Sequence, residues 1–388
     1  MPPTPTIPLP RYGDAALADL TPALLSALGV AGCRDSLGID PVRAVCLLLV
    51  DGLGWELLRR HADEAAFLGG LLAGGAALTA GFPATTATSL ASLGTGVPPG
   101  EHGLVGYLLR LPGHDRPVNL LRWASAGPGP AADLLDALPP ERFQPRRTVF
   151  ERAADAGLAV NVVAPRDQAR SGLTRAVLRG GRFVAALTAG DLAAHVLDAL
   201  RRPAPSFVYA YVGELDLVGH VRGPSSPAWR LQLAHLDRLV ALVAERLPRG
   251  TALVVTGDHG MVEVAEEHRV DVDRVPELRA GVRMLGGEPR ARHVYAEPGA
   301  AADVLATWRE LLGDRMWVLP RDEAVGAGWF GPVVAEPVRA RIGDVVAAAY
   351  GDVGVVQPSV EPLLSAFPGQ HGSFTAAEQL VPLLTVHG

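Results

Sequence analysis

The chain has 388 residues, of which 48% are hydrophobic and 20% charged, and its formal net charge is −6. This length accommodates one large domain or two ordinary ones, and the composition is sufficient to bury a full hydrophobic core. The acidic balance, with no long run of one sign, excludes an extended basic groove for nucleic acid.

Targeting signals are absent from the sequence. The first twenty residues lack a basic segment followed by an apolar one, so we expect no signal peptide. No apolar run approaches the ~20 residues that span a bilayer. The two cysteines, Cys33 and Cys46, do not suggest a disulfide framework. We therefore expect a cytoplasmic protein without a membrane partner.

Apolar segments of strand length alternate with segments of helical periodicity. The strand-like segments are continuously apolar, which is typical of strands covered on both faces, and they comprise residues 43–50, 158–164, 206–212 and 251–256. The helical segments comprise residues 148–157, 190–202 and 228–247. This alternation predicts an α/β fold with a mainly parallel sheet that is flanked by helices on both faces.

Two segments interrupt the alternation. Residues 104–124 resemble a hairpin that turns at Pro112 and Gly113. Residues 268–355 carry additional strand and helix signals, including "ARHVYAE" and "AADVLATWRELLG". We interpret 268–355 as an inserted α+β cap subdomain, so that residues 1–267 and 356–388 form the catalytic core.

Acidic and histidine side chains follow the apolar segments at the points where the predicted strands end. Open α/β sheets bind their ligands at the carboxyl ends of the strands, and carboxylate and imidazole groups suit Zn²⁺ while also accepting Mn²⁺. Each residue alone has an ordinary explanation, such as a helix cap, a pair on a helix face or a structural histidine. Their repeated position favours a metal site built from Asp51, Asp216, His220, Asp258, His259 and, near the C-terminus, His371.

The segment "GFPATTATSLASLGTG", residues 81–96, contains a candidate nucleophile. Thr85 and Thr86 stand where a helix is predicted to begin, and their ordinary role there is to cap the helix. A helix N-terminus also stabilises an anion through its free N–H groups and its dipole. A threonine activated by a metal at this position could attack a phosphate.

These motifs together resemble the alkaline phosphatase superfamily, and most closely its nucleotide pyrophosphatase/phosphodiesterase-like branch. The run "FPATTATSLASLGTG", from Phe82 to Gly96, aligns without gaps on that branch's "FPTKTFPNHYSLVTG", which places the nucleophilic threonine at Thr86. The branch's "D…GH", "DHGM" and terminal "HG" elements align on Asp216–His220, Asp258–His259 and His371–Gly372. The resemblance covers residues 43–265 and about 365–388.

The resemblance implies a two-metal hydrolase of small-molecule phosphodiesters or nucleotide pyrophosphates that forms a covalent phospho-threonine intermediate. Two divalent ions are implied, with zinc expected and manganese as the alternative. One ion would be held by Asp216, His220 and His371, and the other by Asp51, Asp258 and His259.

One departure from the family pattern leaves the substrate open. Phosphodiesterases of this branch carry an Asn that contacts a phosphate oxygen, and the aligned position here is Tyr107, whose hydroxyl we expect to bind the substrate instead. The alternatives are a phosphomonoesterase, a phosphonoacetate-type C–P hydrolase, or a catalytically inactive metal-dependent ligand-binding protein. Within the predicted cap, Arg290 and Arg292 could recognise an anionic group, although we expect them to be solvated on the surface.

Overall fold

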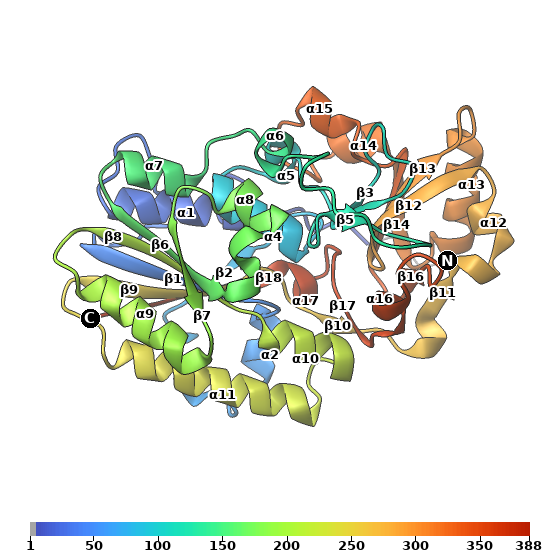
Figure 1. The fold of residues 1–388 in the computed structure, drawn as a ribbon. Coiled ribbons are helices and arrows are strands. Elements are labelled where there is room, and N and C mark those ends of the chain that lie inside the picture. Colours follow the sequence, from blue (N-terminus) through green and yellow to red (C-terminus); the bar gives the residue numbers. More distant parts are fainter. Residues whose placement is uncertain (1–4) are drawn as a thin grey trace.

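The structure is a computed structural model that describes residues 5–388. Its largest sheet has seven strands in the order β2-β18-β9-β1-β8-β6-β7 (Figure 1). Strands β9, β1, β8, β6 and β7 are parallel, and β18 is antiparallel to both of its neighbours. The strands are β1 (Ala44–Val50), β2 (Ala76–Thr79), β6 (Ala159–Pro165), β7 (Arg182–Ala186), β8 (Ser206–Val212), β9 (Thr251–Gly257) and β18 (Leu380–His387). This arrangement confirms the predicted fold class.

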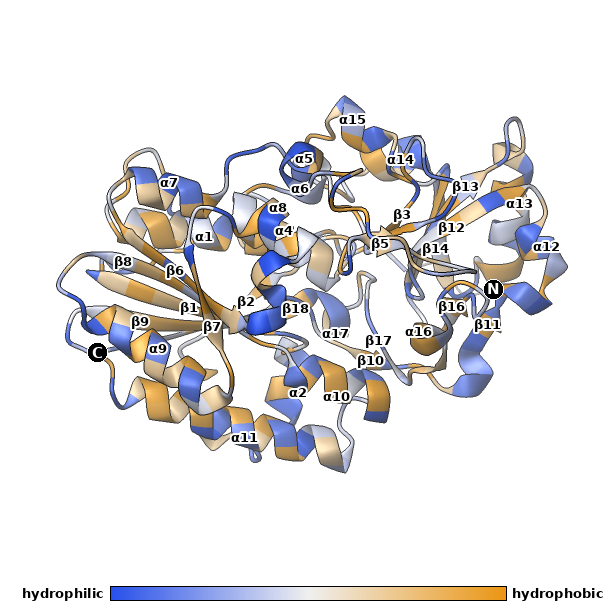
Figure 2. Ribbon diagram, in the orientation of Figure 1, coloured by the Kyte–Doolittle hydropathy of each residue, from blue (hydrophilic) through white to orange (hydrophobic). Residues whose placement is uncertain are grey.

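Helices cover both faces of this sheet, because both faces are apolar. All seven residues of β1 are buried, and alternate residues enter different hydrophobic clusters: Val45 packs on one face and Cys46 on the other. One face carries α1 (Leu17–Ala27), α4 (Thr86–Thr95), α7 (Val149–Asp155) and α8 (Gly172–Val177). The other carries α2 (Trp55–Arg60), α3 (Ala66–Leu71), α9 (Ala189–Arg201), α10 (Glu214–Arg222) and α11 (Pro227–Ala244). Figure 2 shows the apolar strands between these layers.

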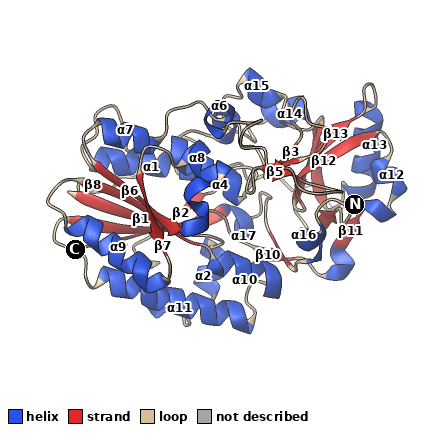
Figure 3. Cartoon of the chain, viewed as in Figure 1, coloured by secondary structure: helices blue, strands red, loops and turns tan. Residues whose placement is uncertain are grey.

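A second sheet lies apart from the first (Figure 3). Its four antiparallel strands have the order β12-β13-β15-β14, with the bounds β12 (Val282–Glu288), β13 (Ala291–Ala296), β14 (Met316–Pro320) and β15 (Val345–Ala349). Helix α13 (Ala301–Leu312) packs on it through Trp308 and forms a separate hydrophobic cluster. The sheet falls within the segment predicted to be a cap, and the division of the chain into core and cap stays a prediction.

Shorter elements complete the fold. The predicted hairpin is present as a small antiparallel sheet of β3 (Leu108–Leu109), β4 (Val118–Asn119) and β5 (Ala124–Ser125), one strand more than predicted. Two further pairs are β10 (Val262–Glu263) with β17 (Gly369–Gln370) and β11 (Arg269–Asp271) with β16 (Gly354–Val356). The short helices are α5 (Pro99–His102), α6 (Pro140–Phe143), α12 (Pro276–Arg279), α14 (Arg321–Gly326), α15 (Glu336–Arg339), α16 (Pro362–Ala366) and α17 (Ala376–Gln379).

Within residues 5–388, no helix has the length and apolar character required to cross a membrane.

Buried ion pairs attach the second sheet to the rest of the protein. Arg290, directly before β13, and Arg292, within it, are each only 1% exposed, so the expected surface location was wrong. The guanidinium of Arg290 donates to both carboxylate oxygens of Glu378 on α17, at 2.8 and 3.1 Å, and Arg292 pairs with Glu361 beside α16. Backbone carbonyl oxygens add to these pairs: Nη1 of Arg290 donates to those of Gly351 and Val353, and Nε of Arg292 donates to that of Val355.

Replacing Arg290 tests the role of this attachment. The variant Arg290→Met leaves the Glu378 carboxylate buried without its charge partner, so we expect a loss of about 3–5 kcal/mol in the free energy of unfolding. Urea denaturation measures this loss. Arg175→Met is the matched control: its pair with Glu141 is about 40% exposed on both sides, and we expect less than about 1 kcal/mol there. Equal effects of the two variants would contradict a structural role for the buried pair.

Candidate active site

The six predicted metal ligands come together at the carboxyl ends of three neighbouring strands. Strand β1 lies between β8 and β9, and its last residue, Val50, is in register with Val212 and Gly257 at their ends. The residues that follow these ends are therefore adjacent. Asp51 follows β1, α10 after β8 carries Asp216 and His220, Asp258 and His259 follow β9, and His371 comes from the loop after β17.

One group of ligands consists of Asp51, Asp258 and His259, all buried. The Nε2 atom of His259 lies 3.4 Å from Oδ1 of Asp51 and 3.4 Å from Oδ2 of Asp258. Neither of these two carboxylate oxygens has a hydrogen-bond partner among the described residues. Because a buried acceptor without a partner is costly, these oxygens fit a cation between them.

The second group consists of Asp216, His220 and His371. The Nε2 atoms of the two histidines face each other at 3.2 Å, and Oδ1 of Asp216 lies 3.5 Å from Nε2 of His220. Both Nδ1 atoms donate to backbone carbonyl oxygens, those of Gly369 and Ala84, at 2.8 Å. With Nδ1 engaged by the backbone, both rings turn their Nε2 atoms toward the shared space, as metal-binding histidines do.

The two groups are adjacent and form one centre. The rings of His259 and His371, one from each group, stack with their centroids 3.6 Å apart and an angle of 13° between their planes. His259 is also fixed through its Nδ1, which donates to the carbonyl oxygen of Gly260 at 2.9 Å. All three histidines are thus oriented by the backbone.

Burial controls the protonation of the centre. It raises the pKa of Asp216 and of Asp258 to about 7, and burial together with the neighbouring Asp258 charge raises the pKa of Asp51 well above its ordinary value. Burial lowers the pKa of His259 to about 4 and that of His371 well below its ordinary value. Neutral imidazoles beside crowded carboxyls are the donor set that divalent cations stabilise, so the residues present fit two such ions.

Two glycines let the loops approach closely enough to build the centre. A Cβ atom on Gly257 would lie 2.2 Å from the carbonyl oxygen of Leu53, and one on Gly260 would lie 2.0 Å from that of Ala377. No other residue fits either position. In the sequence "GDHG", the two candidate ligands Asp258 and His259 are therefore flanked by glycines, because only glycine leaves room for the neighbouring backbone at these two positions.

Thr86 is the threonine that faces this centre. It is the first residue of α4, and its Oγ1 lies 3.3 Å from Nε2 of His259. Thr85, the residue before the helix, is 2% exposed, and its side chain does not cap the helix. The first-turn amides of α4 are therefore free of a side-chain cap and available to an anion beside Thr86.

Comparison with known families agrees with this geometry. The type I phosphodiesterase / nucleotide pyrophosphatase family matches residues 45–374. The chain belongs to this family. The family lies in the alkaline phosphatase superfamily, and membership implies a phosphoester hydrolase. A search of curated proteins found no match.

Solved structures with the same fold as this phosphodiesterase-family protein are distant in sequence. An inactive variant of murine ectonucleotide pyrophosphatase/phosphodiesterase 5, in complex with AMP, has a TM-score of 0.67 and 17% identity over 88% of this chain and 87% of that one. Phosphonoacetate hydrolase from Sinorhizobium meliloti 1021, in complex with phosphonoformate, has a TM-score of 0.66 and 20% identity over 89% and 90%. At these identities the likeness establishes the fold alone.

Tyr107 is buried next to this centre, but its hydroxyl is already engaged. It donates to Oε2 of Glu361 at 2.6 Å, while the backbone N–H of Tyr107 donates to Oε1 of Glu288 at 2.8 Å. A contact between the hydroxyl and a substrate stays a prediction, and it would have to replace the bond to Glu361.

Sequence reasoning missed two residues of the site. Tyr211 donates from its hydroxyl to Oδ2 of Asp51 at 2.5 Å. The sequence feature that could have identified it is a tyrosine near the end of a strand that is otherwise apolar. Glu288 lies beside Thr85, whose hydroxyl interacts with its carboxyl. No local pattern in "GGEPRARHVY" distinguishes Glu288 from a surface residue.

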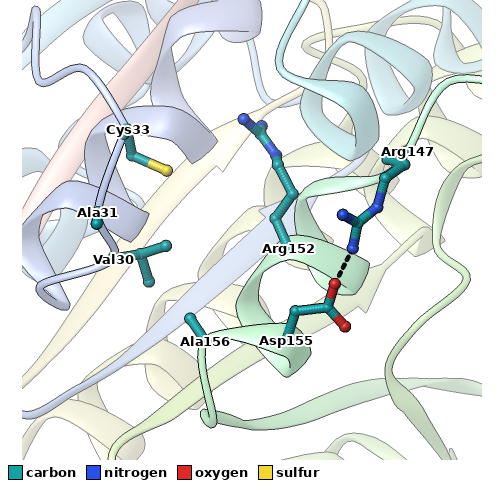
Figure 4. A pocket seen from close by; sticks show the side chains of 8 residues that line it. Val30, Ala31, Cys33, Arg147, Arg152, Asp155 and Ala156 are labelled. Carbon is teal, nitrogen blue, oxygen red and sulfur yellow. Dashed lines mark hydrogen bonds and ion pairs between the residues drawn. The ribbon is translucent and has the colours of Figure 1, made fainter.

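A surface hollow elsewhere in the protein contains none of the candidate site residues. It is lined by the loop after α1, including Cys33, and by residues of and before α7, where Arg147 pairs with Asp155 (Figure 4).

The raised carboxyl pKa values predict how pH controls stabilisation by metals. In the unfolded chain Asp216 and Asp258 ionise near pH 4, whereas in the metal-free fold their pKa is about 7. Between these values the native state holds more protons, so the stability of the metal-free protein falls as pH rises. Bound cations favour the ionised carboxylates. The increase in Tm on adding Zn²⁺ or Mn²⁺ to chelated protein should be small at pH 5 and large at pH 8.

The control for this measurement is Asp258→Asn, which removes one anionic ligand and should reduce the shift at pH 8. A metal-induced shift that is the same at pH 5 and pH 8 would contradict the assignment of these carboxyls as ligands.

Proposed function

We propose that the protein is a two-metal hydrolase of phosphodiesters or nucleotide pyrophosphates, with Thr86 as the nucleophile. The observation that carries the proposal is the position of Thr86 Oγ1. It lies 3.3 Å from His259 at the uncapped start of α4, beside two groups of metal-ligand side chains. A phosphoryl group at this point would meet a nucleophile and free amides together.

The six ligands would hold two divalent cations, with zinc as the proposed ion and manganese as the alternative. When bound, such ions activate a hydroxyl by lowering its pKa and neutralise negative charge that develops on phosphoryl oxygens. The protein's contribution is to fix the ligands: Tyr211 holds one oxygen of Asp51, and backbone carbonyls set the tautomers of the histidines.

In the proposed reaction, Oγ1 of Thr86 forms a bond to phosphorus while the bond to the leaving oxygen breaks. The proton lost by the threonine passes to solvent. The leaving oxygen departs either as a phosphate or, after taking a proton from solvent, as an alcohol. The first-turn amides of α4 orient the phosphoryl oxygens. Water then hydrolyses the phospho-threonine, which releases the phosphate product and restores the hydroxyl.

The relatives named above differ in what they bind, and this bears on the substrate. One solved relative holds AMP and another holds phosphonoformate. A phosphodiester or pyrophosphate follows from the family, and the phosphomonoesterase and C–P hydrolase reactions are alternatives at the same site. An inactive ligand-binding protein is the alternative from a different class. We propose a small-molecule substrate and a cytoplasmic location.

Two chromogenic substrates distinguish these functions. Hydrolysis of bis-p-nitrophenyl phosphate and p-nitrophenyl phosphate should be measured on chelated protein before and after adding Zn²⁺ or Mn²⁺. We expect metal-dependent turnover that favours the diester, because the family acts on diesters. Preference for the monoester would assign a phosphatase, and no turnover of either compound with two metals bound would favour the ligand-binding alternative.

Thr86→Ala tests the nucleophile directly. Removing the hydroxyl should reduce turnover by roughly 10³-fold or more and abolish the phosphoenzyme, while metal content stays unchanged because none of the six ligands is altered. Turnover, acid-trapped phosphoprotein and bound metal are the three measurements. If Thr86→Ala stays active and Thr85→Ala does not, the nucleophile is the neighbouring residue.

A further inference from the structure

Glu288 presents a buried carboxyl with one unsatisfied oxygen beside the nucleophile helix. It is 2% exposed and ends β12 of the second sheet. Its Oε1 accepts the backbone N–H of Tyr107 at 2.8 Å. Its Oε2 is buried and has no hydrogen-bond partner among residues 5–388. A buried polar atom without a partner requires an explanation, because leaving it unpaired costs stability.

The contacts of Glu288 place it against both parts of the candidate site. Its carboxyl interacts with the hydroxyl of Thr85, which immediately precedes Thr86. A Cβ atom on Gly372, the residue after His371, would lie 3.3 Å from the Cβ atom of Glu288. The carbonyl oxygen of Gly372 in turn accepts the N–H of Ala84 at 2.9 Å. Glu288 therefore lies where the His371 loop meets the start of α4.

The charged neighbour that could neutralise Glu288 is engaged elsewhere. Arg292 pairs with Glu361, which also accepts the hydroxyl of Tyr107. Burial raises the pKa of Glu288 to about 8, which favours the protonated carboxylic acid. Because Oε1 already accepts an amide hydrogen, the proton of that acid belongs on Oε2. The nearby hydroxyl of Thr85 forms no hydrogen bond with Oε2, so this proton lacks an acceptor among the described residues.

We infer that Oε2 of Glu288 donates a hydrogen bond to a non-bridging oxygen of the substrate's phosphoryl group. The inference rests on the proposed function, since it assumes that a phosphoryl group is held at Thr86. It makes Glu288 a substrate-binding residue supplied by the second sheet. A neutral donor at this position holds the phosphoryl oxygen without adding to the negative charge of the three aspartates, as protonated carboxyls do in other buried anion sites.

The hydrogen bond from the N–H of Tyr107 fixes the orientation of the Glu288 carboxyl, so the substitutions Glu288→Gln and Glu288→Met can test the inference. In Glu288→Gln, the N–H of Tyr107 should hold the amide oxygen, so that the NH₂ group occupies the position of Oε2 and remains a donor. Glu288→Met keeps a similar volume but has no donor. The probe is inorganic phosphate, measured as its inhibition constant against bis-p-nitrophenyl phosphate, together with KM, metal content and Tm.

We expect the inhibition constant of Glu288→Gln to stay within about threefold of the wild type and that of Glu288→Met to rise roughly 10- to 100-fold, because hydrogen bonds to charged groups are among the stronger ones. Metal content should be unchanged in both variants. A folded, metal-loaded Glu288→Met that binds phosphate as the wild type does would overturn the inference, as would equal losses in Gln and Met. If Glu288→Met does not fold, Glu288→Asp decides, because its shorter side chain withdraws the oxygen and should weaken phosphate binding.

Glu361→Gln is the structural control. It alters a buried carboxyl of the same network, but both oxygens of Glu361 are bound by Tyr107 and Arg292. We therefore expect Glu361→Gln to have a lower Tm but a phosphate inhibition constant within about twofold of the wild type. If its inhibition constant instead rises as much as that of Glu288→Met, the contribution of Glu288 is one of packing alone. Thr86→Ala separates the two proposals: persistent turnover there refutes the nucleophile, whereas the ratio of the phosphate inhibition constants of Glu288→Met and Glu288→Gln tests Glu288 whichever threonine is the nucleophile.

Discussion

Three carboxyls at one edge of the sheet, two of them buried and that of Asp216 half-buried, are the constraint on which the rest of the site depends. Asp51, Asp216 and Asp258 lie together because β1 is in register with β8 and β9, so their strand ends coincide. Burial opposes their ionisation, and no described cationic side chain pairs with their free oxygens. Such an arrangement is stable in its ionised form only with cations between the carboxylates. The electrostatic cost of these crowded carboxylates would be removed by the two cations proposed above.

Backbone geometry, rather than other side chains, sets the orientation of the imidazoles. The Nδ1 atoms of His220, His259 and His371 all donate to carbonyl oxygens. The glycines at 257 and 260 separately let the loops of Leu53 and Ala377 pack against the Asp258–His259 segment. A carbonyl held by a loop is less easily displaced than a flexible side chain. The ligands are thus positioned before any ion binds, which lowers the entropy cost of binding.

The sequence predicted the features that depend on local pattern. Continuous apolar runs identified four strands of the main sheet, and polar residues after those runs identified the metal-ligand groups now found together. Long-range contacts could not be read in this way. The burial of Arg290 depends on Glu378, which is 88 residues away in the sequence, and the hydroxyl of Tyr107 meets Glu361 across 254 residues. Glu288 carried no periodicity that would mark it as buried, because its environment is made by the loop of Tyr107 and the start of α4.

The second sheet therefore contacts the candidate site through individual side chains and does not only cover it. Arg290, directly before β13, joins the second sheet to α17, which follows the His371 loop, and Glu288 at the end of β12 lies beside Thr85 at the N-cap of α4. Tyr107, directly before β3, connects the small hairpin sheet to Glu288 through its N–H and to Glu361, the partner of Arg292, through its hydroxyl. A change of sequence in the second sheet would alter the position of groups beside Thr86 without touching a metal ligand. Under the proposed function, substrate binding can change through Glu288 while the six candidate ligands stay fixed, because Glu288 belongs to the second sheet and the candidate ligands belong to the main sheet and its loops.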